Sequence, residues 1–166
     1  MAKKSKEFSE LVRQQKREKA SNRSFEKFQR SVKRDFGADI QTMTGQDGIA
    51  KMSDVLKDFV SPYADIPQNM QEIRHLIETA VTAWDLALMP EGERIIMLDK
   101  IFVSMIKKAK KSIDKEDIAT SRALIEDLID RKLKYFADNQ RRVIDFQVED
   151  LGQDGYHLSV ASTMPQ

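Results

Sequence analysis

Apolar side chains recur at every third or fourth position in four stretches between residues 49 and 136, and beyond residue 139 they alternate with polar ones. The first spacing predicts amphipathic helices, and strict alternation predicts strands with one apolar face. Pro62, Pro90 and Asp114 divide the helical stretches, which we place at 49–60, 65–89, 90–111 and 114–136. A chain with this change of period is expected to form a helical bundle followed by a β element.

The β element is predicted to be a hairpin, because two alternating runs flank the turn sequence Gly152-Gln153-Asp154-Gly155. An isolated hairpin is marginally stable in water, so its apolar face should lie on the bundle or pair with another chain. The predicted fold class is therefore mainly α (α+β): a bundle of four to five helices with a C-terminal two-stranded β-hairpin. The apolar positions of the two runs are Ile144, Phe146, Val148, Tyr156, Leu158 and Val160.

Prolines mark two helix starts in this pattern. Pro67 is expected in the first turn of the second helix, where a missing N–H costs nothing, and Pro90 is expected to open the third helix. The predicted buried face of the third helix consists of Ile95, Leu98, Ile101, Phe102, Met105 and Ile106.

Charge divides the chain into two parts. Residues 1–34 hold 12 Lys/Arg against 4 Asp/Glu, a net charge of +8, which leaves −7 on the remainder of a chain with net charge +1. This asymmetry predicts a basic arm over residues 1–36, a turn-rich linker over 37–48, and the helical bundle with its hairpin over 49–163.

The arm carries two short apolar stripes at helical spacing, one around Leu11 and one through Phe25, Phe28, Val32 and Phe36. Ser21-Asn22-Arg23-Ser24 lies between them and offers N-cap residues, so the arm is either two helices or one helix with a weak middle. The second stripe carries too much apolar surface to remain in water and is expected to dock.

The arm is the leading candidate for a functional site. Its cations could neutralise phosphates in salt-dependent, largely sequence-independent binding of nucleic acid or another polyanion. Docking on a protein partner or on the acidic body, and a merely solvated helix surface, remain as alternatives. The twelve candidate polyanion-binding residues are Lys3, Lys4, Lys6, Arg13, Lys16, Arg17, Lys19, Arg23, Lys27, Arg30, Lys33 and Arg34.

The sequence offers little catalytic chemistry. Without cysteine the chain has no disulfide, thiol nucleophile or cysteine-ligated metal, and no glycine-rich phosphate loop or Gly-x-Ser-x-Gly elbow occurs. Glu72 and His75 have the Glu-x-x-His spacing of di-iron bundles, but a second such pair is missing. We expect no metal, no cofactor and no catalytic residue, with Asp85, beside Trp84, as the one carboxylate that burial could turn into a general acid.

The segment Thr82-Ala83-Trp84-Asp85-Leu86-Ala87-Leu88-Met89-Pro90 resembles the Ala-Trp-Asn-Leu-Ala-Leu-Leu-Pro stretch of a group of small bacterial proteins without an assigned activity. Residues 141–146 and 157–162 also resemble that group, so the likeness covers residues 50–163. Some members carry a cysteine-rich zinc tail, which this chain lacks. The resemblance implies a bacterial cytoplasmic protein.

Two classes of function remain open. The first is a non-catalytic interaction protein whose residues 1–36 engage nucleic acid or a protein complex, with possible self-association through the hairpin edge or the arm. The second is a small carboxylate-dependent enzyme, or a subunit of a larger enzyme assembly. No apolar run approaches the length of a membrane span, so no membrane partner is expected.

Overall fold

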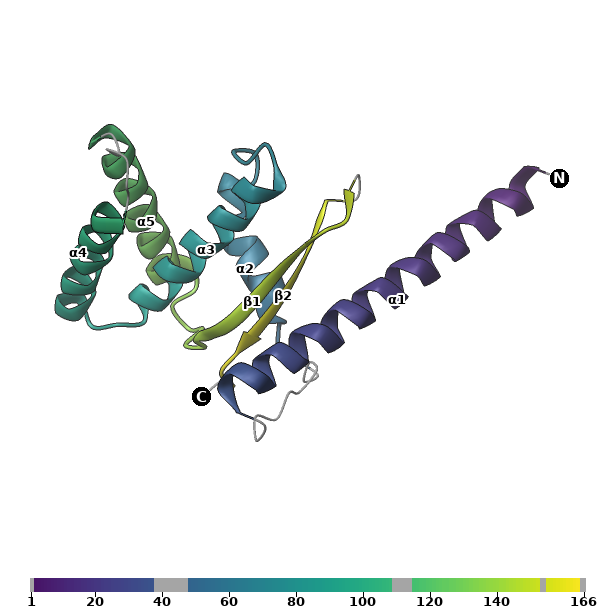
Figure 1. The fold of residues 1–166 in the computed structure, drawn as a ribbon, viewed down its shortest axis with the longest axis horizontal. Coiled ribbons are helices and arrows are strands. Elements are labelled where there is room, and N and C mark those ends of the chain that lie inside the picture. Colours follow the sequence, from purple (N-terminus) through teal and green to yellow (C-terminus); the bar gives the residue numbers. More distant parts are fainter. Residues whose placement is uncertain (1, 38–47, 109–114, 153–154, 165–166) are drawn as a thin grey trace. The chain divides into compact units, whose positions relative to one another are not determined.

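The computed structural model describes residues 2–37, 48–108, 115–152 and 155–164, and it leaves the side chains of 2–13, 16–18, 20, 21, 108 and 115 undescribed. The described residues form five α-helices, a short 3-10 turn and a two-stranded antiparallel hairpin (Figure 1). The predicted mainly α class with a C-terminal hairpin is confirmed. The elements are α1 (Ala2–Phe36), α2 (Met52–Val60), η1 (Ser61–Tyr63), α3 (Met70–Ala87), α4 (Glu91–Lys108), α5 (Lys115–Tyr135), β1 (Val143–Asp150) and β2 (Tyr156–Ser162).

The chain divides into two compact units. The arm unit comprises residues 1–49 and 147–159, that is α1 and the distal half of the hairpin. The helical unit comprises residues 50–146 and 160–166, that is α2 to α5 and the proximal half of the hairpin. The two strands therefore contribute residues to both units.

In the helical unit α3 is the central element and packs against α2, α4 and α5. Its largest fully buried side chain is Trp84, whose ring meets the Phe59 ring edge-on with centroids 5.2 Å apart and the Phe136 ring with centroids 5.8 Å apart. Aromatic rings prefer such edge-to-face contacts. This cluster joins α2, α3 and the end of α5 into one core.

Asn69 sets the start of α3. Its backbone is extended, and its side-chain oxygen accepts a hydrogen bond of 3.0 Å from the Glu72 N–H, while Glu72 accepts one of 2.8 Å from the Gln68 N–H. Asn69 thereby satisfies one of the backbone donors that a helix start leaves without partners, and Glu72 binds the N–H of the residue before the cap. The expectation that Pro67 lies in the first turn is therefore wrong, because the helix begins after the asparagine cap.

The helix α4 is only partly covered. Leu98 and Phe102 are buried, as expected, and Pro90 directly precedes the helix. Ile95, Met105 and Ile106, however, keep about half of their surface exposed, so the predicted buried face is wrong for these three positions. Lys110, Lys111 and Asp114 lie outside the described residues.

In the arm unit α1 is one continuous helix, and Ser21 to Ser24 lie inside it rather than at a new start. Ser24, Phe28 and Val32 are buried and recur every four residues, so they form one stripe along the helix. Val148, Leu158 and Ser159 are the buried residues of the distal hairpin in the same unit. Docking of the second stripe holds for Phe28 and Val32 but is wrong for Phe36, which is 51% exposed at the helix end.

Candidate functional site

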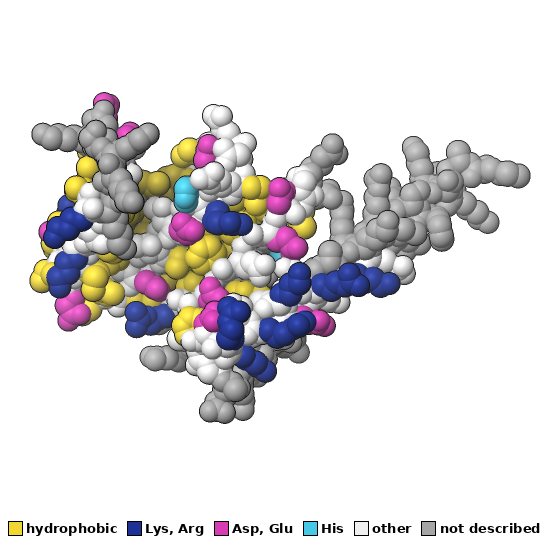
Figure 2. All heavy atoms as spheres, in the orientation of Figure 1, with side chains coloured by type: hydrophobic (Ala, Val, Ile, Leu, Met, Phe, Trp, Pro, Cys, Tyr) yellow, Lys and Arg dark blue, Asp and Glu magenta, His cyan; other side chains and the backbone are white. Residues whose placement is uncertain are grey.

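The described cations of α1 gather on one side of the helix. With about 100° of rotation per residue, their six positions fall within an arc of about 120°, and every one of the six side chains is exposed. Figure 2 shows Lys and Arg side chains along this part of α1. We call these residues the cationic face; they are Lys19, Arg23, Lys27, Arg30, Lys33 and Arg34.

The cationic face lies opposite the buried stripe of the same helix. The centre of the arc is about 160° around the helix from Phe28, the central residue of the stripe. Phe25 and Phe36, the other aromatic residues of this half of α1, also fall outside the arc. Because the cations and the buried stripe lie on opposite sides of α1, the cations are exposed while the stripe packs within the arm unit.

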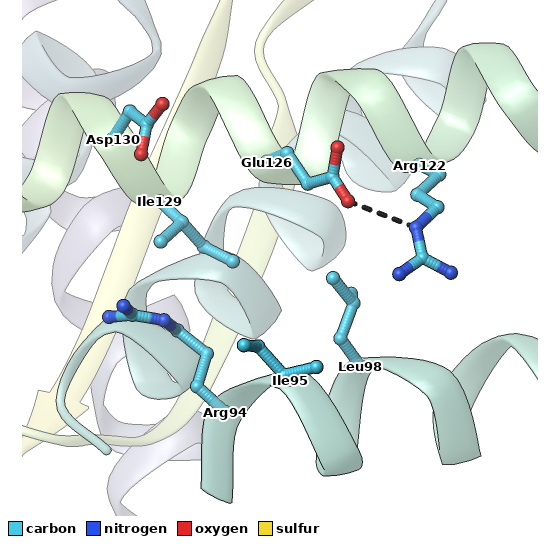
Figure 3. Close-up of a pocket in the computed structure, with 7 residues that line it drawn as sticks. All are labelled: Arg94, Ile95, Leu98, Arg122, Glu126, Ile129 and Asp130. Atoms are coloured by element: carbon cyan, nitrogen blue, oxygen red, sulfur yellow. Dashed lines mark hydrogen bonds and ion pairs between the residues drawn. The ribbon is translucent and has the colours of Figure 1, made fainter. Parts of the chain in front are cut away.

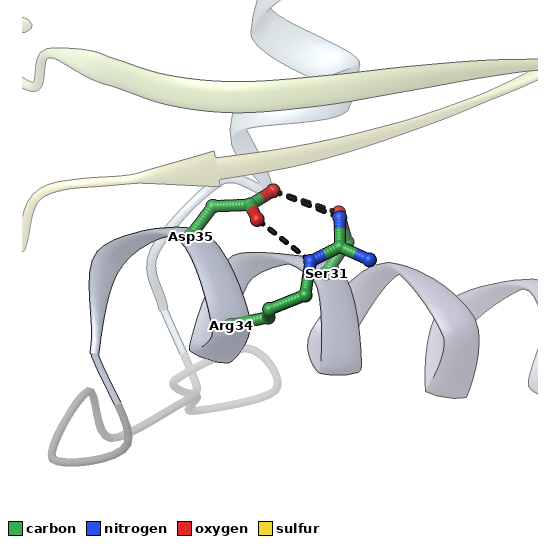
Figure 4. Close-up of polar contacts among 3 residues, drawn as sticks. All are labelled: Ser31, Arg34 and Asp35. Atoms are coloured by element: carbon green, nitrogen blue, oxygen red, sulfur yellow. Dashed lines mark hydrogen bonds and ion pairs between the residues drawn. The ribbon is translucent and has the colours of Figure 1, made fainter.

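Two cations of the face have a carboxylate partner on α1 itself. Arg30 lies 3.7 Å from Glu26, and the Nε atom of Arg34 donates to Asp35 at 2.8 Å, with Ser31 donating to the other Asp35 oxygen at 3.2 Å (Figure 4). The hydrogen bond from Arg34 lowers the pKa of Asp35, and the same contact raises the pKa of Arg34. All four charged groups are exposed, so these pairs add little to stability.

Lys19, Arg23, Lys27 and Lys33 form no ion pair within the part of the chain that the structure describes. Among the described residues, four of the six cations are therefore without a carboxylate partner. The other six candidates, Lys3, Lys4, Lys6, Arg13, Lys16 and Arg17, lie on α1 where side chains are outside the described set.

Asp85 accepts a hydrogen bond from a backbone N–H in this structure. It is partly buried on α3, and its Oδ1 atom accepts a hydrogen bond of 3.4 Å from the Val143 N–H at the start of β1. Desolvation raises its pKa, against the opposing effects of this hydrogen bond and of Arg142. The carboxylate thus fastens the first strand to the central helix.

Glu72 and His75 are not joined by a third metal-ligating side chain among the residues that the structure describes. Glu72 is engaged in the cap of α3, and His75 is exposed. Across the described ranges no group of three or more His, Asp or Glu side chains is arranged to hold a metal ion.

The sequence patterns did not predict two cations that the structure buries, Lys132 and Arg141. Lys132 is 1% exposed, and the Arg141 guanidinium donates to the Ala50 carbonyl at 3.0 Å and to Asn139 at 3.1 Å. The Arg141 carbonyl in turn accepts a hydrogen bond of 2.8 Å from the Trp84 indole N–H. Lys132 continues the helical spacing of the apolar residues Ile125 and Leu128, and this spacing could have indicated its burial. Nothing in the local sequence pattern indicates that Arg141 is buried.

A small pocket of about 150 Å³ lies between α4 and α5 (Figure 3). Its floor is apolar, from Ile95, Leu98 and Ile129, and Arg94 stands at one end. At the other end Arg122 is held by Glu126 and Asp99, each at 2.9 Å. The site joins two antiparallel helices and presents no nucleophile with an adjacent base.

No protein-family model, no curated protein and no solved structure matches the chain. The resemblance of residues 82–90 to the small bacterial proteins therefore stays a prediction. None of the described helices has the combination of length and hydrophobicity that a bilayer crossing requires.

Proposed function

We propose that the protein binds nucleic acid through the cationic face of α1. The observation that carries the proposal is the gathering of six exposed cations on the side of α1 away from its buried stripe. Lysine and arginine side chains that neutralise phosphates release condensed counterions, and this release drives sequence-independent binding. From Lys19 to Arg34 the face runs for about 22 Å along the helix, a length that can follow several consecutive phosphates.

The composition of the face favours nucleic acid over an acidic protein surface. Between Lys19 and Arg34 the arc of about 120° holds six cations and Glu26 but no apolar side chain. Protein interfaces are usually built around an apolar centre with charges at the rim. A face of six cations and one carboxylate, without an apolar centre, is better suited to a phosphate backbone, where contacts position the protein without reading bases.

The carboxylates considered for catalysis do not support an enzyme proposal. Glu72 caps α3 and Asp85 accepts from the backbone of β1, so each already has a structural partner. An active site would instead need convergent polar groups in a pocket.

The test is a fluorescence anisotropy titration of the full chain with labelled single-stranded RNA, single-stranded DNA and duplex DNA over a series of salt concentrations. We expect K19Q/R23Q/K27Q to bind more weakly and to flatten the slope of log K against log salt by about 2 to 3. Glutamine keeps good helix propensity, so α1 should persist.

The matched control is K51Q/K134Q/R142Q, which removes the same charge from exposed positions of the helical unit. It should retain the wild-type slope. If wild-type protein fails to bind any of the three nucleic acids, or if both triple variants flatten the slope equally, the proposal is wrong. Binding to an acidic polypeptide such as polyglutamate but to no nucleic acid would favour a protein partner instead.

A further inference from the structure

The surface of α4 is unusually apolar for a helix that faces solvent. Six of its aliphatic or thioether side chains are between 38% and 57% exposed, half of the large exposed hydrophobic residues in the described chain. Exposed apolar patches with polar borders are typical of protein interaction sites. The six residues are Ile95, Ile96, Met97, Val103, Met105 and Ile106.

Two of these residues lie on a face of α4 that is turned away from the core. Ile96 and Val103 share it with Asp99, Lys100 and Lys107, because these positions fall within an arc of about 100°. Together with Ser104 they line a shallow groove. In Figure 2 apolar side chains are visible between charged ones over this helix. We call this surface the α4 face.

Charge changes sign along α4, both within the α4 face and at Glu93 beside it. Glu93 and Asp99 belong to the N-terminal half of the helix, and Lys100 and Lys107 belong to the C-terminal half. A second α4 that runs antiparallel would therefore place its Lys100 beside Asp99, which also binds Arg122 of α5, and its Lys107 beside Glu93. A parallel copy would place like charges together, Asp99 against Asp99 and Lys100 against Lys100.

We propose that the occupant of the α4 face is a second copy of this chain, related by a twofold axis that passes between the two α4 helices at the level of residues 99 and 100. In that register Ile96 of each copy faces Val103 of the other, and Asp99 faces Lys100. A twofold interface must be self-complementary in this way.

The ends of the helix fit the same register. Lys107 of one copy meets the first turn of the other α4 at Gly92 and Glu93. A side-chain carbon built at Gly92 would find no heavy atom within 4 Å, so this turn leaves room for the approaching lysine. The antiparallel arrangement also places the positive end of each helix dipole beside the negative end of the other. This surface is separate from the hairpin edge and the arm, on which the sequence suggested self-association.

Sedimentation equilibrium of the full chain over a range of concentrations tests the dimer. We expect I96E/V103E to weaken dimerisation by at least about 100-fold, since each substitution buries a charge at the centre of the interface. The matched control I66E/M164E adds the same charge at exposed apolar positions elsewhere and should dimerise like the wild type. A monomer at all concentrations, or a dimer that tolerates I96E/V103E, would overturn the proposal.

A charge exchange tests the register. E93K and K107E should each weaken the dimer at least about tenfold, and the double variant E93K/K107E should recover it, because the pair between copies is restored with reversed sign. Both substitutions oppose the helix dipole, so a loss that came only from a weakened α4 would deepen in the double variant. Failure of the double variant to recover the dimer would contradict the antiparallel register.

Crosslinking gives a second measure, because the chain has no cysteine. A mixture of I96C and V103C proteins should form a crosslinked dimer with a short bismaleimide. Each variant alone should not, since the two identical positions lie about 10 Å apart along the helix axis. Equal crosslinking of each variant alone would exclude the proposed register.

Discussion

The Nζ atom of Lys132 lies 4.7 Å from the centroid of the Trp84 ring and donates a hydrogen bond of 2.9 Å to the Phe136 carbonyl. Lys132 is 1% exposed, so its amine is held almost entirely by protein groups. The ring face attracts a cation, and the carbonyl belongs to the negative end of α5, where backbone acceptors lack partners within the helix. The side chain therefore closes the end of α5 while it fills the core beside Trp84.

Truncating the Lys132 side chain should reduce the stability of the helical unit. We expect K132A to lower the free energy of unfolding of the helical unit by about 2 to 4 kcal/mol, because it leaves a cavity beside Trp84 and an unpaired Phe136 carbonyl. K132M keeps most of the buried length and should lose less. Urea unfolding followed by the fluorescence of Trp84, the only tryptophan of the chain, measures both. Equal losses for the two variants would show that packing of the aliphatic stem is unimportant.

Lys132 should also make stability rise in alkaline solution. Burial lowers the pKa of its amine in the folded chain, so the unfolded chain binds more protons between that pKa and the ordinary value of 10.5. Stability should therefore increase with pH in that window, relative to K132M. The same unfolding experiment at a series of pH values checks the sign. A difference between wild type and K132M that stays constant or falls with rising pH would contradict it.

The sequence predicted those elements whose apolar spacing is regular and whose ends carry strong signals. The hairpin and the helix after Pro90 were found because alternation and proline are local properties. The start of α3 was misplaced because Pro67 and Asn69 both mark helix starts, and only the three-dimensional arrangement shows that Asn69 makes the cap.

Burial was harder to predict than secondary structure. Phe28 and Phe36 have the same side chain and belong to the same stripe, yet Phe28 is 5% exposed and Phe36 is 51% exposed. Helical spacing gives the face on which a residue lies, but how far the covering element extends depends on residues distant in sequence. The same reason explains Arg141, whose partner Ala50 is 91 positions away.

The sequence predicted the net positive charge of the arm, and the structure shows that six of its cations lie on one side of α1. Counting Lys and Arg gave the net charge of residues 1–34, but the sequence left open two helices or one. Only the continuous helix brings Lys19 and Arg34 onto the same side.

Ionised Asp85 should reduce stability at neutral pH. Burial raises its pKa above 3.8 in the folded chain, so the folded chain binds more protons than the unfolded chain just above that value. Stability should then fall as the pH rises through the folded pKa. D85N keeps an oxygen for the Val143 N–H and should remove this fall. We expect the variant to stay within about 1 kcal/mol of the wild type at pH 7.

D85A is the control for Asp85, because it removes the acceptor as well as the charge. It should be less stable than D85N by about 1 kcal/mol or more, since the Val143 N–H loses its partner. Chemical unfolding at several pH values between 4 and 7 measures all three proteins. If D85N is less stable than wild type by a margin that grows with pH, the ionised carboxylate is stabilising and the interpretation is wrong.

The cap of α3 should contribute measurably to stability. N69A removes the acceptor for the Glu72 N–H and should cost about 1 kcal/mol, whereas N69D should cost little because aspartate is an equally good cap. Asn22 provides the matched control, since it is exposed inside α1 and alanine favours a helix interior. Thermal unfolding followed by circular dichroism compares the variants. A loss for N22A as large as that for N69A would contradict the capping role.

The two phenylalanines near the end of α1 should differ sharply in effect. Phe28 belongs to the buried stripe of the arm unit, which also contains the distal hairpin, so F28A should loosen the packing of both elements. Deleting a buried phenyl ring costs about 3 kcal/mol, and local opening that is easier by this amount should speed amide exchange about 100-fold. Hydrogen exchange followed by mass spectrometry should show the increase in residues 147–159 and in the second half of α1. F36A, at a position that is half exposed, should leave these amides at wild-type rates. Slow exchange of the hairpin in F28A would mean that its packing within the arm unit does not depend on the stripe.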